Sequence, residues 1–408
     1  MVDDISYKNY KKKNDIHGSV LYPAVMVAPI QKDILNKLIK RDKIKNIFDP
    51  FHGSGTALYE ALEISNQIEL IGCDINPLAN LITKVKLQGV TDDINSDIEE
   101  LEKYIVDSVE YEIYTFINIE KWFREDIIKS LSLIRHSIMK IRNYRNRLYF
   151  WYMLSDIVRK YSNTRSSTYK LHIKKEESIN RMKNNVIEDY ISAVKENVDK
   201  FKKHADKFKL FKCDTLEKIK DFNDNSIDIS ITSPPYGDNA TTVTYGQFSI
   251  LTLLWIDRND LELDGWELSN FSVIDSRSLG GRLREVNLNK FEKDLINPYI
   301  IRISEKKIKK VEKFFNDYFL FLKELTRVTN KYIVMTLGNR TVDGVNINLT
   351  NITQVFLSNH GFKEEEFIER EIPCKRIPKK TSSVNNKPVS SMNYEYLIIY
   401  KKTTNIYY

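Results

Sequence analysis

The sequence predicts an open, doubly wound α/β fold, and three segments carry this prediction. Residues 44–56 read as an apolar strand that runs into a glycine turn, and residues 57–64 have the composition of a helix. A second strand, residues 68–74, ends in an acidic residue about 20 positions after that turn, where doubly wound folds place a carboxylate for a ribose. A third segment, residues 226–232, alternates apolar and polar side chains and stops at two prolines.

Composition narrows the class of protein. The chain has 408 residues, of which 29% are charged and 42% hydrophobic, which is ordinary for a globular protein and argues against disorder. A net charge of +7 gives modest support for a polyanionic partner. The sequence has no run of 18 apolar residues and no apolar segment of the kind found in signal peptides, so we expect a cytoplasmic protein without a membrane segment. Cys73, Cys213 and Cys374 are odd in number and far apart, which favours free thiols and no metal site.

The first part of the chain, residues 1–90, begins with an arm, residues 1–16, that we expect to be mobile. A Tyr-Pro turn then leads into an apolar-periodic segment whose helix begins near Pro29, where a missing backbone donor costs little. In the turn after the first strand, Gly53 and Gly55 let the backbone approach a ligand, and the helix from Thr56 offers free backbone donors. A tight turn without a ligand uses the same residues.

The second strand strengthens the prediction of a nucleotide-like ligand. It ends at Asp74, and Asn76-Pro-Leu-Ala-Asn80 opens another helix. Strand, glycine turn, helix, strand and aspartate together favour a site for an adenosine group. A hydride-carrying dinucleotide normally needs a third glycine, which this turn lacks.

Residues 91–205 are predicted to form a helical insertion. Its loop at residues 159–172, which contains Arg165 and Lys170, mixes basic, hydroxyl and aromatic side chains. Loops that contact phosphates have this composition, and so do ordinary solvated loops.

Residues 206–256 return to the sheet. The strand at residues 208–214 ends in Asp214, which can accept from an exocyclic amine or cap the next helix. The strand at residues 226–232 leads to Ser233-Pro-Pro-Tyr236. Two prolines remove two backbone donors and fix two φ angles, so the carbonyls around them keep set directions. Rigid acceptors beside an aromatic face suit a flat ring that bears an amine.

The rest of the chain comprises an irregular insertion, residues 257–305, and the end of the core, residues 306–408. Arg277, Arg282 and Arg284 flank a Gly-Gly turn that can enter a DNA groove, although exposed loop arginines are common. We expect a helix from residue 306, a strand at 331–337, a helix at 348–359, and strands at 362–372 and 394–401. Lys375 and Arg376 lie in a basic stretch between the last two strands.

Two motifs together resemble a known family. Asp49-Pro-Phe-His-Gly-Ser-Gly-Thr56 with Thr232-Ser-Pro-Pro-Tyr236 is similar to the amino-directed DNA methyltransferases, which use S-adenosylmethionine to methylate cytosine N4 or adenine N6. The resemblance covers about residues 17–90, 206–256 and 311–401. It implies a class I, Rossmann-like methyltransferase core with a mostly parallel sheet and an antiparallel last strand.

The resemblance also implies roles for particular residues. Gly53, Gly55 and Asp49 would face the methionine part of the cofactor, Asp74 the ribose, and Asp214 with Cys213 the adenine. The full cofactor set is Tyr22, Pro23, Asp49, Phe51, Gly53, Gly55, Thr56, Asp74, Asn76, Cys213 and Asp214. The catalytic set is Ser233, Pro234, Pro235 and Tyr236, and the candidates for DNA contact are Arg165, Lys170, Arg277, Arg282, Arg284, Lys375 and Arg376. Both insertions are candidates for reading the target sequence.

The resulting expectation is a site-specific methyltransferase that flips cytosine out of duplex DNA and methylates N4, because serine at position 233 is commonest among the N4-cytosine members. A restriction-modification or phage-defence setting, with a restriction endonuclease as partner, follows from the same resemblance. Adenine N6, structured RNA and a non-catalytic nucleic-acid binding role are the alternatives. The dipeptide Pro373-Cys374 is similar to the nucleophile of C5-cytosine enzymes, but its place between the last two strands indicates coincidence.

Overall fold

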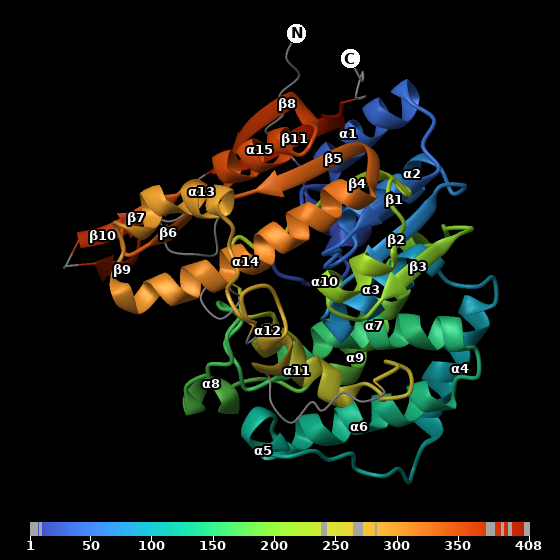
Figure 1. Ribbon diagram of the computed structural model, residues 1–408. Coiled ribbons are helices and arrows are strands. Elements are labelled where there is room, and N and C mark those ends of the chain that lie inside the picture. The colour runs from blue at the N-terminus through green and yellow to red at the C-terminus, as the bar shows by residue number, and fades with distance from the viewer. Residues whose placement is uncertain are drawn as a thin grey trace.

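The structure is a computed structural model that describes residues 7, 10–237, 243–263, 272–281, 284–372, 380–384, 387–390 and 394–403, with 380–384 and 387–390 described by their backbone alone. It confirms the α/β class: a seven-stranded sheet carries helices on its faces (Figure 1). The strands lie in the order β3-β2-β1-β4-β5-β11-β8. Their bounds are β1 Asn46–Asp49, β2 Glu69–Cys73, β3 Phe208–Phe211, β4 Ile227–Thr232, β5 Thr329–Leu337, β8 Phe362–Glu371 and β11 Tyr394–Lys402.

The sheet is mostly parallel. Strands β1 to β5 pair in parallel with their neighbours. The last strand, β11, inserts between β5 and β8 and runs antiparallel to both. The predicted antiparallel last strand is thereby confirmed, and the carboxyl ends of the five parallel strands meet at one edge of the sheet.

Side chains of the central strands alternate between two apolar clusters. In β5, Tyr332 and Val334 join the cluster on one face, while Ile333 and Met335 join the cluster on the other. The first face is covered by α1 Ala28–Arg41, α2 Thr56–Ile64 and α3 Pro77–Gln88, and the second by α10 Thr215–Lys218, α14 Glu305–Val328 and α15 Leu349–Asn359. Covering both faces is what lets the strands be apolar throughout.

The N-terminal arm differs from the prediction. The structure places 3-10 helices at Lys12–Asn14 and Ile16–Gly18, and buries Ile16 and His17. Because Ile16, the last residue of the predicted mobile arm, belongs to the apolar cluster of the first sheet face, the end of that arm is part of the core. The next residue, His17, meets the edge of the Tyr59 ring on α2 at 5.5 Å. Helix α1 then begins at Ala28 with Pro29 in its first turn, as predicted.

The predicted helical insertion is confirmed, and it shares the core of the first sheet face. It contains α4 Ile94–Asp107, α5 Ile119–Trp122, α6 Glu125–Lys140, α7 Tyr144–Tyr161, α8 Glu176–Asn180 and α9 Val186–Asn197, followed by a 3-10 helix, Val198–Phe201. Helix α7 is the centre of this layer: residues 148–154 are all buried. It packs against α3, α6, α9 and α11 Tyr245–Trp255.

The segment predicted as irregular, residues 257–305, contains α12 Ser272–Ser276 and α13 Lys290–Ile300. A capping box, in which Asn289 and Glu292 bond each other's backbone N–H, starts α13. Sequence reasoning also missed the 3-10 turn Ile219–Asp221 and two hairpins, β6 Arg340–Val342 with β7 Val345–Ile347, and β9 Lys380–Val384 with β10 Lys387–Ser390. Within the described ranges, no helix combines the length and apolarity needed to cross a membrane.

Candidate functional site

The predicted site residues of the core meet at the carboxyl edge of the sheet. Asp49 is the last residue of β1, Asp74 follows β2, and Ser233 follows β4. Since β1 lies between β2 and β4, these three side chains follow neighbouring strands. Asp214 lies beyond the end of β3, the strand next to β2, and so extends the row.

The glycine turn is hydrogen-bonded to Asp74, which follows the second strand. Gly53 and Gly55 have φ of 50° and 71°, which L side chains rarely adopt. The N–H of Gly53 donates to Asp74 Oδ2 at 2.9 Å, and a Cβ on Gly55 would lie 2.6 Å from the Thr83 side chain. Asp74 Oδ1 accepts from the N–H of Asn76 at 2.8 Å. Both glycines are therefore required by the conformation of the turn, and Asp74 fixes it.

Asp49 is a buried carboxyl group with an unused oxygen. Its Oδ1 accepts from the N–H of Phe51 at 3.1 Å, whereas Oδ2 is buried with no hydrogen-bond partner. Burial raises the pKa of Asp49 to about 7, against the opposing effects of that hydrogen bond and of the nearby Thr232 side chain. Thr56 Oγ1, at the start of α2, is also buried and unpaired. Such orphaned groups beside a glycine turn fit a ligand that brings its own cation and donors.

The Tyr22-Pro23 turn closes over the glycine turn. The Tyr22 ring lies 3.5 Å from the position that a Cβ on Gly53 would take. Its hydroxyl accepts from Asn76 Nδ2 at 3.0 Å, and the same amide donates to Ser249 Oγ on α11 at 2.8 Å. Asn76 also caps α3 by accepting from the N–H of Leu78, so its amide is fully used in joining three segments.

Asp214, one of the residues predicted to face the adenine of the cofactor, contacts the second insertion. Asp214 caps α10 by accepting from the N–H of Leu216 at 3.0 Å, and its Oδ2 pairs with Arg284 at 2.9 Å. Cys213 lies with its sulfur 3.6 Å from that of Cys73, and both are free thiols. Phe51 packs its ring against Phe321 of α14 at 5.0 Å. The geometry shows Asp214 as a helix cap, and it is also compatible with acceptance of a hydrogen bond from an exocyclic amine.

The Ser-Pro-Pro-Tyr turn leaves β4 as a compact unit. The Ser233 and Tyr236 hydroxyls are 3.0 Å apart, and the Tyr236 hydroxyl also donates to the Thr336 carbonyl at 3.4 Å. Burial raises the pKa of Tyr236, so this phenol stays protonated. Pro234 is buried and Pro235 partly buried. The Tyr236 side chain is thus held from its hydroxyl end by the turn and by β5.

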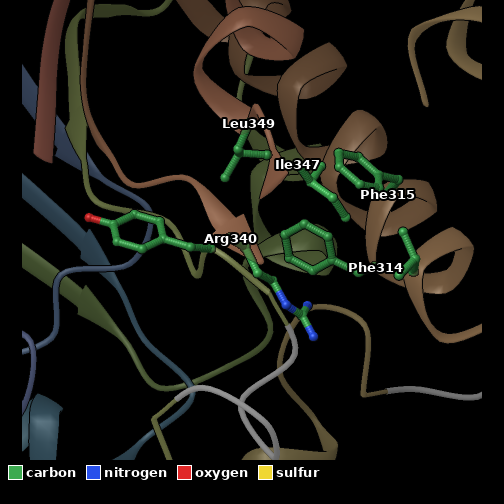
Figure 2. A pocket seen from close by; sticks show the side chains of 7 residues that line it. Phe314, Phe315, Arg340, Ile347 and Leu349 are labelled. Carbon is green, nitrogen blue, oxygen red and sulfur yellow. The ribbon is translucent and has the colours of Figure 1, made fainter. Parts of the chain in front are cut away.

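A small cavity of about 10 Å³ adjoins the turn. Its lining contains Tyr236, Arg340 of β6, and the apolar side chains Val311, Phe314, Phe315, Ile347 and Leu349. Figure 2 shows the Arg340 guanidinium pointing away from Leu349. A Cβ on Gly237 would lie 2.1 Å from one guanidinium nitrogen, so Arg340 covers the residue that follows Tyr236. Arg340 was not found from the sequence.

The candidates for DNA contact differ in their surroundings. Arg165 and Lys170 are exposed on the loop of the first insertion. Arg284 instead pairs with Asp214, Glu217 and Asp317. Arg277 is the first residue after α12, and Arg282, Lys375 and Arg376 lie outside the described residues. The described side chains contain no group of three or more His, Cys, Asp and Glu suited to a metal ion.

Thr83 and Ser249 complete the site and were also missed. They lie on α3 and α11, and contact the glycine turn and Asn76 across long stretches of sequence. Neither belongs to a motif, so only the folded arrangement identifies them.

Comparison with known proteins gives two relatives. The chain is 30% identical over 413 residues to the type II methyltransferase M.MvaI of Kocuria varians, covering 93% of this chain and 89% of that protein. It is 33% identical over 97 residues to the type II methyltransferase M.MjaII of Methanocaldococcus jannaschii, which is 24% of this chain and 16% of the relative. No protein-family model matches the sequence.

Proposed function

Because the chain belongs to the type II DNA methyltransferases, we propose that it transfers a methyl group from S-adenosylmethionine to the N4 amine of cytosine within a specific sequence of duplex DNA. The observation that carries the proposal is the Ser233-Pro-Pro-Tyr236 turn at the carboxyl end of β4, directly beside the strand that ends in Asp49. A restriction endonuclease of the same specificity is the partner that this function implies.

The described residues fit the cofactor. Asp49 Oδ2 and Thr56 Oγ1 need partners, and the amino-acid end of S-adenosylmethionine carries an ammonium and a carboxylate. Each Asp74 oxygen accepts one hydrogen bond, which leaves lone pairs for ribose hydroxyls. Cys213 and Asp214 would lie at the adenine. When bound, S-adenosylmethionine supplies a methyl group on a positively charged sulfonium.

The turn prepares the amine for attack. The lone pair of an exocyclic amine is delocalised into the ring, which makes it a poor nucleophile. The Ser233 hydroxyl and the Pro234 carbonyl would accept hydrogen bonds from the amine and favour a more tetrahedral nitrogen. The nitrogen would then bond to the methyl carbon as the carbon–sulfur bond breaks with its electron pair on sulfur, and one amine proton would be released to water. No covalent enzyme intermediate forms, and positioning supplies most of the rate.

Tyr236 would stack on the extruded base. Stacking on an aromatic side chain is worth about 1–3 kcal/mol, which offsets much of the few kcal/mol that base flipping costs. The Tyr236 hydroxyl orients Ser233 in the free enzyme, and a serine oxygen that meets one hydroxyl keeps capacity for a further hydrogen bond.

The loop of the first insertion is our proposed DNA contact. A bridge between Thr164 and Ile173 closes it, and Arg165 and Lys170 are exposed on it. The N–H of Leu171 donates to Gln247 of α11 at 3.1 Å, which places the loop beside the helix that follows the catalytic turn. The ion pairs of Arg284 argue for a structural role in the second insertion.

Transfer of a labelled methyl group to duplex DNA and to structured RNA tests the function. We expect label in duplex DNA alone, and a loss of tenfold or more for Ser233→Ala, since one hydrogen bond to a developing charge is worth about 1.5–3 kcal/mol. Ser226→Ala is the matched control, because Ser226 is exposed at the opposite end of β4. Label in RNA alone, or full activity of Ser233→Ala, would contradict the proposal.

A further inference from the structure

Beneath the glycine turn lies a buried chain of charged and polar groups that the methyl-transfer mechanism does not use. Lys86 near the end of α3, His17 of the N-terminal segment and Glu60 of α2 are 1%, 3% and 6% exposed. Lysine is almost never fully buried without a paired role. Its burial here therefore needs an explanation.

The hydrogen bonds of this chain have one consistent direction. Lys86 Nζ donates to the Ser54 carbonyl at 2.7 Å and lies 3.3 Å from His17 Nδ1. His17 Nε2 lies 2.8 Å from Glu60 Oε1. A neutral His17 that accepts at Nδ1 and donates from Nε2 satisfies all three groups, and burial keeps the pKa of His17 well below its ordinary value.

Lys86 acts on the backbone between the two glycines. Ser54 separates Gly53 from Gly55, and the Gly53 carbonyl accepts from Thr83 Oγ1 at 3.1 Å. With the Gly53 N–H held by Asp74, three backbone groups of the turn bond to side chains: the Gly53 N–H, the Gly53 carbonyl and the Ser54 carbonyl. Both carbonyls accept hydrogen bonds from side chains of α3, which weakens their repulsion of the carboxylate of an amino-acid ligand. Burial lowers the pKa of Lys86 to about 7, so at neutral pH the lysine acts on the turn chiefly through its hydrogen bonds, and its full positive charge is present only at lower pH.

The same lysine joins the glycine turn to the N-terminal segment. His17 belongs to the segment that carries Tyr22 over Gly53, and Tyr22 is bonded to Asn76. The N-terminal segment is therefore attached near the glycine turn at two points, through His17 and through Tyr22. Further charged or titratable groups that face this chain are Lys12 and Asp15 of the N-terminal segment, Lys32 of α1, and Tyr59 and Glu63 of α2.

We propose that Lys86 is a positioning residue for S-adenosylmethionine: it holds the glycine turn in its binding conformation and fastens the N-terminal segment to it. The inference rests on the proposed function and adds a residue that touches neither cofactor nor DNA.

Calorimetry with S-adenosylhomocysteine, and anisotropy with duplex DNA without cofactor, test this role. Lys86→Met keeps length but removes charge and donors, and we expect a rise of tenfold or more in the Kd for S-adenosylhomocysteine with DNA affinity within twofold of wild type. At saturating S-adenosylmethionine kcat should stay close to wild type. Lys84→Met is the matched control on the same helix, because Lys84 pairs with Glu262 at the surface.

Lys86→Gln keeps an N–H donor in a milder change and should give an intermediate Kd, so it decides the question if Lys86→Met does not fold. Wild-type affinity in the Lys86 variants, or an equal loss in Lys84→Met, would overturn this inference alone. A wild-type protein that binds no S-adenosylhomocysteine would overturn the proposed function and the inference with it.

Discussion

Replacing Asp49 with asparagine should make the protein more stable above neutral pH while weakening cofactor binding. Asp49 is fully buried, and its Oδ2 has no partner, so its negative charge is poorly compensated in the free enzyme. Asparagine has nearly the same shape and can still accept from the Phe51 N–H. The substitution therefore removes the charge and little else.

The magnitude follows from the pKa. Raising the pKa of Asp49 from 3.8 to about 7 corresponds to about 4 kcal/mol. Below about pH 4 the folded and unfolded chains both hold the proton, so the group contributes nothing. Between about pH 4 and 7 the folded chain keeps a proton that the unfolded chain has lost, and the free energy of unfolding falls as pH rises. Above about pH 7 the ionised, buried Asp49 lowers the free energy of unfolding by the full amount.

Denaturant unfolding of wild type and Asp49→Asn between pH 4 and 8 measures this. The free energy of unfolding of the variant minus that of wild type should rise by about 4 kcal/mol across the range, because other ionisable groups cancel in the difference. At pH 8, S-adenosylhomocysteine should stabilise wild type much more than the variant. A difference that does not change with pH would refute the reasoning about Asp49.

Three further predictions concern the loop, the turn and the aromatic ring. Replacing both Arg165 and Lys170 with alanine should reduce the steepness of the plot of log DNA-binding constant against log salt concentration by about 2, one for each phosphate contact. Arg284→Ala should instead lower thermal stability and leave that slope unchanged. The reverse pattern would move the DNA contact to the second insertion. Gly55→Ala places a side chain at a φ of 71° and 2.6 Å from Thr83, so calorimetry should show at least tenfold weaker cofactor binding. Unchanged binding would mean that the cofactor also binds to another backbone conformation of the turn. Tyr236→Phe keeps the ring and should stay within about tenfold of wild-type activity in steady-state assays, while Tyr236→Ala should lose about ten- to hundredfold; equal losses would assign the role to the hydroxyl instead of stacking.

The core could be predicted because its signals are local. The apolar segments that lead to Asp49 and Asp74 show their strands directly, and Asn76 and Pro77 mark the start of α3. Once the strands are parallel, their carboxyl ends must share an edge, so the meeting of Asp49, Asp74 and Ser233 followed from the class of fold.

Other features could not be predicted, for two different reasons. The contact of Arg284 with Asp214 and that of Lys86 with Ser54 join residues distant in sequence, and no periodic pattern announces them. The β6–β7 hairpin and α13, by contrast, have local signals in the sequence. Asp343-Gly344 between alternating apolar residues is typical of a hairpin, and Asn289 with Glu292 is typical of a helix start.

The identity of the methylated nucleoside is the most direct test of the central claim. Duplex DNA methylated by the protein, digested to nucleosides and analysed by mass spectrometry, should contain N4-methylcytosine, and Ser233→Ala should form it at least tenfold more slowly. N6-methyladenine as the sole product would contradict the assignment of the Ser233-Pro-Pro-Tyr236 turn to cytosine.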